Sequence, residues 1–314
     1  MISRRLLRIK VLQVFYAHLF SNPRFDIELA HKNLEKSIFE YYRLYFLLTD
    51  LLLEIKKAAE QKIEIEKSKF FSDETTRKPF EQIAGNRILR KIENSKNFKQ
   101  IKTKYKINWS EHPGFLKKMF SDFQTTKVFQ ILTRDISDFS DDKKAIIKTL
   151  SDFIHIYSPM YAELEEMSIF WNDDIEFALS MVEKTIKGIT ESSEDIIFFP
   201  LYKNDDDKHF AVNLLEKTIL EQDERKKQMI PFLRNWDLQR IFVLDIYTIQ
   251  LAITEFIHFP TVPVKVTINE YIDISKAYGT VKSWAFINGI LDKIAVDFKE
   301  KNIIQKKGRG LVEK

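Results

Sequence analysis

The sequence opens with four basic residues and no acid in its first ten positions: Arg4, Arg5, Arg8 and Lys10. On a helix, Arg8 shares a face with Arg4 and with Arg5, which precede it by four and three residues. Cations at a helix N-terminus oppose the helix dipole, so folding gains nothing from them there. Arginine forks match the oxygens of phosphate, and a helix N-terminus also favours an anion. The cluster is therefore a candidate phosphate-binding site, with a solubilising basic end as the alternative.

A second candidate site lies near the C-terminus, where Lys282, Phe286, Gly289 and Lys293 fall on one face of a predicted helix. An aromatic ring between two lysines, beside a residue without a Cβ, suits an RNA base that stacks on ring and backbone. The alternative is a partly buried phenylalanine between two solvated lysines. Two aromatic residues near the same turn could extend the stacking platform or belong to the core: Tyr278 and Trp284.

Signatures of catalysis are missing from the sequence. It has no GxGxxG, GxxxxGK[ST], HExxH or GxSxG motif, which argues against a dinucleotide fold, a P-loop, a zinc protease and a hydrolase elbow. It has no cysteine, and its six histidines lack ligand-like spacing, so we expect no metal site and no cofactor. Adjacent carboxylates such as Asp173 and Asp174 point to different helix faces and make a poor acid/base pair. The sequence favours a protein that is not an enzyme.

The charges of the 314-residue chain are segregated, although the formal net charge is only +4. Residues 85–120 contain ten Lys and Arg against two acids, whereas residues 163–176 contain six acids and no base. Several basic blocks indicate a polyanionic partner, and a solvated helix face is the alternative for any one of them. The longest uncharged run, residues 11–23, is too short to span a membrane and no signal peptide is evident, so we expect a cytoplasmic protein without a membrane span.

The chain is expected to be all-α. It has only seven glycines and eight prolines, and apolar residues recur at spacings of three and four. A first helix ends at residues 21–23, and a very long one covers about residues 27–67. Shorter helices are predicted at about 80–95, 113–134, 141–157, 159–187, 208–231 and 237–258.

The turn signals are sharpest before the last two helices. "TINE" is a Thr-x-x-Glu capping box, which predicts that a helix begins at Thr267. Gly279 is expected in a left-handed conformation after that helix, and Ser283 is expected to cap the next one. Gly289 lies beside the core stripe of the last helix, where another backbone or a ligand can approach closely. The predicted stripe consists of Ile287, Ile290, Leu291 and Ile294.

These segments resemble the bacterial transcription antitermination factor NusB family. The stretches "NWDLQRIFVLDIYTIQLAITEF" (235–256) and "VPVKVTINEYIDISKAYGTVKSWAFINGILDKIA" (262–295) carry the family's W-x-L-x-R-I, L-A-x-x-E, I-N-E, K-x-[YF]-G and F-[IV]-N-G-[IV]-L-D elements in order. The stretch "RRLLRIKVLQVFYAH" (4–18) is similar to the family's arginine-rich first helix. Matching motifs cover about residues 3–20 and 205–296.

The resemblance implies a helical bundle with a NusB-like RNA-binding fold and a large helical insertion. We expect the NusB-like core in residues 1–22 and 170–303, the insertion in residues 25–165 and a basic flexible tail in residues 304–314. The implied RNA contacts, together with the two lysines of the last helix, are Arg4, Arg5, Arg8, Tyr278, Lys282, Phe286 and Lys293. The implied protein-partner contacts are Tyr16 and Asp245.

The implied function is that of a non-enzymatic transcription factor. A protein of this family binds single-stranded boxA RNA in nascent transcripts, mainly ribosomal RNA leaders, together with the ribosomal protein that serves as NusE. The complex acts on RNA polymerase and opposes premature termination. Two alternatives remain, a NusB-like domain associated with an RNA methyltransferase and a helical scaffold that binds only protein. Lys282 stands where the family often has an acid, which favours RNA electrostatically.

Overall fold

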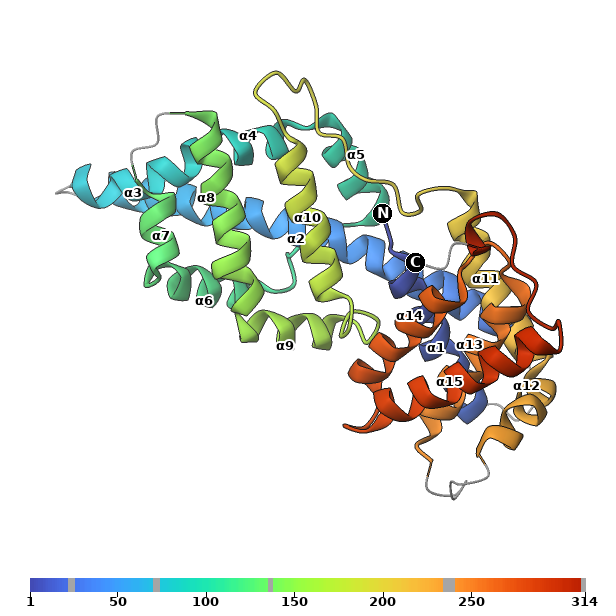
Figure 1. The fold of residues 1–314 in the computed structure, drawn as a ribbon. Helices are drawn as coiled ribbons and strands as arrows, with labels where there is room; N and C mark the ends of the chain where they lie inside the picture. Colours follow the sequence, from blue (N-terminus) through green and yellow to red (C-terminus); the bar gives the residue numbers. More distant parts are fainter. Residues whose placement is uncertain (22–25, 70–73, 135–137, 234–240, 312–314) are drawn as a thin grey trace. The chain divides into compact units, whose positions relative to one another are not determined.

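The computed structural model describes residues 1–21, 26–69, 74–134, 138–233 and 241–311. These residues form helices and no strand, so the prediction of an all-α fold is confirmed (Figure 1). No helix among them is both long and apolar enough for a membrane span. The chain divides into two compact units, which are described separately. Unit 1 comprises Met1 and Phe39–Leu201, and unit 2 comprises Ile2–Ile38 and Tyr202–Lys314.

Unit 1 contains most of the long helix α2 (Ile27–Lys67) and the helices that follow it in the sequence. Two buried indoles fix neighbouring segments to α2, because the Nε1 of Trp109 donates to the carbonyl oxygen of Leu47 at 3.1 Å and that of Trp171 donates to Glu40 at 3.0 Å. The other elements of unit 1 are α3 (Glu74–Gly85), α4 (Arg87–Asn94), α5 (Lys96–Tyr105), α6 (Pro113–Gln124), α7 (Lys127–Leu132), α8 (Phe139–Asp152), η1 (Ile154–Ile156), α9 (Ser158–Met167) and α10 (Ile175–Gly188).

Unit 2 brings the first helix of the chain against the last ones. Helix α1 packs on α11, α13 and α14, and α13 packs on α11, α14 and α15, so α1 and α13 lie at the centre of the unit. The elements besides the first part of α2 are α1 (Arg4–Ser21), α11 (Asp205–Leu220), α12 (Gln222–Met229), η2 (Ile230–Leu233), α13 (Val243–His258), α14 (Val264–Tyr278), α15 (Ser283–Glu300) and η4 (Gly308–Leu311).

The long helix α2 has the predicted bounds, but several shorter helices are divided where the sequence predicted one. The predicted helix at about 80–95 is interrupted at Asn86, whose side chain accepts hydrogen bonds from the backbone N–H groups of Ile88 and Leu89. The predicted helix at 113–134 is likewise interrupted at Thr126, which caps α7. Local hydrogen bonds from polar side chains thus compete with helix continuation.

The predicted capping box at Thr267 is wrong, because α14 begins at Val264, directly after Pro263. The hydroxyl of Thr267 instead donates to Glu255 at 2.8 Å. Gly279 is also not left-handed, since its φ is −97°. A Cβ at this glycine would lie 2.4 Å from the Cβ of Ser283, so the glycine serves the close approach of α15. Residues 236–240 of the W-x-L-x-R-I element lie outside the described residues.

The compact units differ from the expected segments at two places. Unit 1 extends to Leu201 and includes α10, which packs on α8, although the sequence assigned residues from 170 onward to the core. The described part of the expected flexible tail is held against unit 2. The Nζ of Lys306 donates a hydrogen bond to the carbonyl oxygen of Phe259 at 3.0 Å. The backbone N–H of Lys307 donates one to the carbonyl oxygen of Pro260 at 2.9 Å.

Candidate nucleic-acid interface

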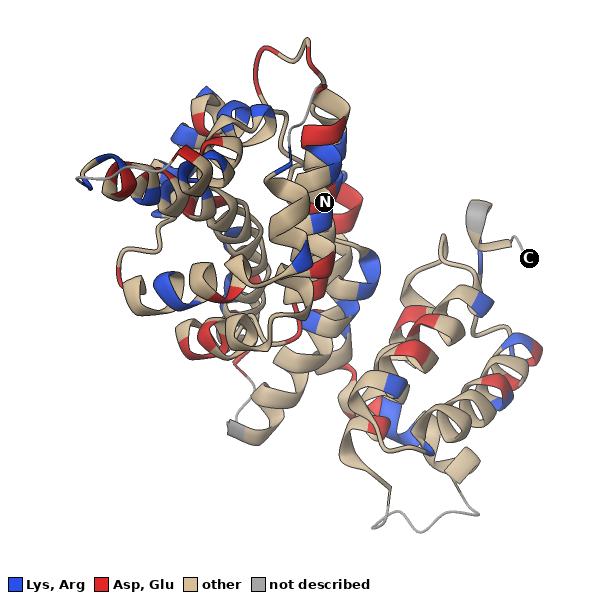
Figure 2. Cartoon of the chain, turned by 90° about the vertical axis from the view of Figure 1, so that its left-hand side faces the viewer, with Lys and Arg blue, Asp and Glu red and all other residues tan. Residues whose placement is uncertain are grey.

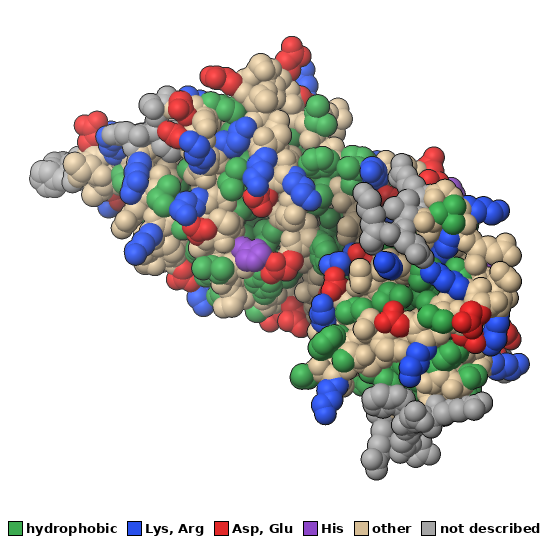
Figure 3. All heavy atoms as spheres, viewed as in Figure 1, with side chains coloured by type: hydrophobic (Ala, Val, Ile, Leu, Met, Phe, Trp, Pro, Cys, Tyr) green, Lys and Arg blue, Asp and Glu red, His purple; other side chains and the backbone are tan. Residues whose placement is uncertain are grey.

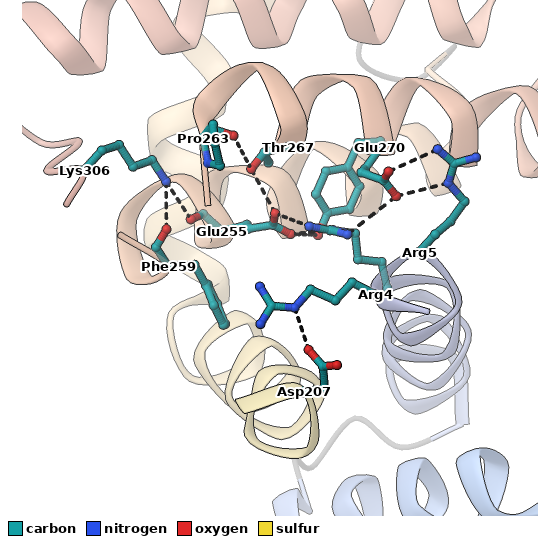
Figure 4. A network of polar contacts seen from close by, with 11 residues as sticks. Arg4, Arg5, Asp207, Glu255, Phe259, Pro263, Thr267, Glu270 and Lys306 are labelled. Carbon is teal, nitrogen blue, oxygen red and sulfur yellow. Dashed lines mark hydrogen bonds and ion pairs between the residues drawn. The ribbon is translucent and has the colours of Figure 1, made fainter. Parts of the chain in front are cut away.

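Arg8, a predicted RNA contact, is buried inside unit 2. Its side chain is 2% exposed and forms a bidentate ion pair with Glu255 of α13, in which Nε lies 2.7 Å and Nη2 2.6 Å from the two carboxylate oxygens. The same carboxylate accepts hydrogen bonds from the hydroxyl groups of Thr267 at 2.8 Å and Tyr271 at 3.2 Å (Figure 4). Both charges are therefore compensated within the core.

The electrostatics of this network agree with a structural role. Burial by itself would lower the pKa of Arg8, but the charge and hydrogen bonds of Glu255 raise it above its ordinary range. Burial and the neighbouring Glu255 raise the pKa of Tyr271 well above its ordinary value, so Tyr271 remains a hydrogen-bond donor. Because Arg8 has no route to a phosphate while it is paired in the core, the prediction that it contacts RNA is corrected.

Arg4 and Arg5 remain at the surface, but each has an acidic partner from another helix (Figure 4). Arg4 pairs with Asp207 of α11 at 2.8 Å, and its guanidinium lies over the ring of Phe210. Arg5 pairs with both carboxylate oxygens of Glu270 at 3.1 Å and with Asp273 of α14 at 2.8 Å. A phosphate that binds either arginine must therefore compete with carboxylates, which weakens the case for a preformed phosphate site.

The face of α15 that the sequence singled out is open to solvent. Lys282, Gly289 and Lys293 are exposed and Phe286 is half-buried, while the predicted core stripe beside them is buried. Neither lysine forms an ion pair with a described acid. A Cβ on Gly289 would meet nothing within 4 Å, so no neighbouring helix explains this glycine. The face combines two available cations, a ring and bare helix backbone.

Two apolar side chains near the start of α15 are exposed outside this face, since residues two apart, such as Trp284 and Phe286, do not share a helix face. Trp284 is 47% exposed and Val281 is almost fully exposed. Tyr278, the predicted RNA contact at the end of α14, is half-buried, and its hydroxyl accepts a hydrogen bond from Gln13 Nε2 at 3.4 Å. Figure 3 shows hydrophobic side chains among charged ones on the surface of unit 2. In Figure 2, the basic residues of the chain are blue and the acidic residues are red. Trp284 is therefore better exposed for stacking than Tyr278.

Asp245, a predicted partner contact, is 5% exposed. It accepts a hydrogen bond from the hydroxyl of Ser283 at 2.7 Å, which ties the start of α13 to the start of α15. Burial raises the pKa of Asp245, and the hydrogen bond from Ser283 opposes that shift. The side chain is therefore a structural link within unit 2, and its prediction as a surface contact is corrected.

Tyr16, the other predicted partner contact, belongs to a group of rings at the end of α1. It is half-buried, and its ring centroid lies 4.8 Å from that of Phe20 and 6.2 Å from that of Tyr247. Phe20 is 70% exposed. Phe20 and Tyr247 were not predicted from the sequence, although Phe20 follows Tyr16 by four residues, a spacing that places both on one helix face. We name Tyr16, Phe20 and Tyr247 the aromatic cluster.

The described residues offer no metal-binding group of three or more His, Cys, Asp or Glu side chains. Among the described histidines, His258 Nε2 pairs with Glu221 at 2.8 Å. Burial lowers the pKa of His258, and the nearby charges of Arg225 and Lys217 lower it further. Arg225 and His258 share the carboxylate of Glu221, and these contacts link α12 to α13.

Comparison with known proteins finds similarity to one family over part of the chain. A model of the NusB family matches residues 174–296, less than half of the chain. Proteins named "Transcription antitermination protein NusB" are similar to 25–28% of the chain, with 46% identity over 79 residues in Chloroherpeton thalassium, 40% over 78 in Salinibacter ruber and 42% over 89 in Desulfatibacillum aliphaticivorans.

These similarities span only 37%, 49% and 62% of the three relatives' own lengths. No solved structure matches the chain. The match includes α15 with its open face, whereas α1 and α5 lie outside it. The chain therefore carries a NusB family domain at residues 174–296.

Proposed function

We propose that this chain is an RNA-binding transcription antitermination factor that contacts single-stranded, boxA-like leader RNA through the open face of α15. The family domain and the names of its relatives support this activity. The observation that carries the proposal is the set of residues on this face, where Lys282 and Lys293 lack acidic partners among the described residues and flank the half-buried Phe286. Folding of the helix requires none of these features.

Each residue of the face has a distinct role in the proposal. Lys282 and Lys293 bind phosphates and release the counterions that surround RNA, which makes the affinity depend on salt. The ring of Phe286 stacks with an unpaired base, a contact worth about 1 to 3 kcal/mol. Gly289 lets the sugar–phosphate backbone approach the helix without meeting a side chain. Arg4 and Arg5 add weaker contacts, since phosphate must displace their carboxylate partners.

The proposal includes a protein partner. The aromatic cluster on α1 and α13 exposes Phe20, and aromatic side chains are enriched in protein interfaces. We assign this cluster to the ribosomal protein that serves as NusE, and we propose that the resulting complex acts on RNA polymerase during transcription of ribosomal RNA. Binding of RNA and binding of the protein partner both occur without a catalytic step by this chain.

Two aromatic substitutions test the proposal by filter binding with single-stranded leader RNA, with and without the ribosomal partner. Phe286→Ala should weaken RNA binding by about 5- to 150-fold, the equivalent of 1 to 3 kcal/mol, whether or not the partner is present. Phe20→Ala is the matched control, because it should preserve binding to RNA alone and reduce only the enhancement by the partner. Helical content and melting must first show both variants folded. A folded Phe286→Ala variant with the parent affinity would refute the assignment of the RNA face.

A further inference from the structure

A second concentration of positive charge lies in unit 1, outside the family match. Residues 94–110 contain five lysines and no acid. They form α5 and the segment that follows it, and α5 buries Phe98 against the unit. The exposed lysines of this segment are Lys96, Lys99, Lys104 and Lys106.

These four lysines have no ion pair with a described acid. Two described acids that contact this segment are already engaged. Asp50 pairs with Lys102, and Asp195 accepts hydrogen bonds from the hydroxyl of Ser95 and the backbone N–H of Asn97. Asp195 thereby caps the N-terminus of α5. The positive charge of the four exposed lysines is therefore uncompensated along the helix.

Several other exposed lysines of unit 1 are paired. Lys57 lies 3.4 Å from Glu54, Lys67 lies 3.0 Å from Glu64, and Lys144 lies 2.9 Å from Asp141. These partners are three residues away in the sequence, the spacing that brings side chains together on a helix. The absence of such acids from α5 therefore distinguishes its surface from these acid-paired helix faces.

Aromatic rings border the lysines at the end of α5. Tyr105 is half-buried, and the Nζ of Lys104 lies 5.1 Å from its ring centroid. The ring of Phe39 lies 5.4 Å from that of Tyr105 and is 38% exposed. Lysines beside partly exposed rings match the two components of single-stranded nucleic acid, because phosphates bind the charges and unpaired bases stack on rings. An acidic protein segment or a lipid surface would use only the charges.

We propose that Lys96, Lys99, Lys104 and Lys106, together with Phe39 and Tyr105, form a second surface for single-stranded RNA. This inference rests on the proposed function, since it extends the RNA contact of this chain beyond the NusB family domain. Lys106 adds an independent detail. Its φ is +53°, in the left-handed region that favours glycine, so the C-cap of α5 carries a lysine where the backbone would prefer no side chain.

The test measures binding of the full chain to an unstructured 30-nucleotide RNA over a range of salt concentrations. The variant Lys96→Gln/Lys99→Gln/Lys104→Gln should bind about 100-fold more weakly at 0.1 M salt, and its salt slope should fall by about 2, since each phosphate contact contributes about 0.7. The matched control Lys57→Gln/Lys67→Gln/Lys144→Gln removes the same charge from acid-paired lysines and should bind like the parent. Lys106→Gly removes one more charge and relieves the left-handed side chain, so it should weaken binding without weakening the fold.

The outcomes separate this surface from the face of α15. If the α5 variant matches the parent while Lys282→Gln/Lys293→Gln loses affinity, the second surface is refuted and the proposed function stands. If only the α5 variant loses affinity, the second surface stands and the assignment to α15 fails. Equal losses in the α5 variant and the paired-lysine control would refute a specific surface. Displacement of the RNA by poly-glutamate as effectively as by unlabelled RNA would refute it in favour of an acidic protein partner.

Discussion

Arg8 and the lysines of α15 look alike in the sequence, since both are basic residues that share a helix face with other functional candidates. In the structure, Arg8 is buried against Glu255, whereas Lys282 and Lys293 are exposed and have no described acidic partner. The difference arises from Glu255, which lies 247 residues away from Arg8 in the sequence. A basic residue is most available to a ligand where the fold brings no acid to it.

The largest expected effect is the loss of stability on replacing Arg8. Arg8→Ala leaves Glu255 charged and without its ion pair in the core, which should lower the free energy of unfolding by about 3 to 5 kcal/mol. Urea denaturation followed by circular dichroism measures this change. The double variant Arg8→Leu/Glu255→Leu should recover part of the stability, because apolar side chains remove the unpaired charge. If Arg8→Ala were as stable as the parent and lost only RNA binding, the structural assignment of Arg8 would be wrong.

The next effect concerns the exposed side of the comparison. Lys282→Gln/Lys293→Gln should reduce the salt slope of RNA binding by about 1.4 and weaken binding at 0.1 M salt by about 25-fold, if each lysine makes one phosphate contact. The melting temperature should stay near that of the parent, since both side chains are exposed. Filter binding at several salt concentrations provides the measurement. An unchanged slope would mean that these lysines do not contact phosphate.

Substitution of Gly289 tests whether RNA approaches the helix backbone on the same face of α15. Because a Cβ would meet open space, Gly289→Ala should fit and raise the free energy of unfolding by about 0.8 to 1 kcal/mol through higher helix propensity. The added methyl group should weaken RNA binding if the strand approaches the backbone there. Denaturation and RNA titration of the same preparation give both quantities. A stabilised variant with parental affinity would assign no RNA role to the glycine.

A further effect depends on pH and concerns the C-terminal segment. Burial lowers the pKa of Lys306 to about 8, although Glu255 opposes the shift. The unfolded chain keeps this proton up to the ordinary value of about 10.5, so it binds more protons than the folded chain between these two pH values. The contribution of Lys306 to stability should therefore rise with pH from 8 to 10.5. The difference between parent and Lys306→Met isolates it, and a difference independent of pH would argue against the buried position.

Much of the fold could be predicted from the sequence, because helical periodicity and the scarcity of glycine and proline are local signals. The bounds of α2 follow directly from its apolar pattern. The break at Asn86 was not predicted, since apolar spacing continues across it and only its side-chain hydrogen bonds stop the helix. Helix α5 was missed although Ser95 caps it locally by accepting a hydrogen bond from the backbone N–H of Phe98, and Asp195, 100 residues away, adds a second contact to the cap.

The candidate site was predicted best where its residues have no distant partner. Lys282, Gly289 and Lys293 depend only on the spacing of one helix, and their exposure follows from it. Arg8 and Asp245 depend on Glu255 and Ser283, and no local pattern identifies these pairs. The misplaced capping box has the same origin, because the Thr267 hydroxyl bonds to Glu255 instead of a helix N-terminus. Burial of polar side chains is a tertiary property that spacing alone does not determine.

The central claim is that RNA lies on the face of α15, and crosslinking tests it most directly. A leader RNA that carries 4-thiouridine is bound to the full chain, irradiated and digested, and the crosslinked peptides are identified by mass spectrometry. The account predicts crosslinks within residues 281–293, near the exposed Trp284 and the half-buried Phe286, and their loss in Lys282→Gln/Lys293→Gln. Efficient crosslinking of the RNA elsewhere in the chain, with none in residues 281–293, would contradict it.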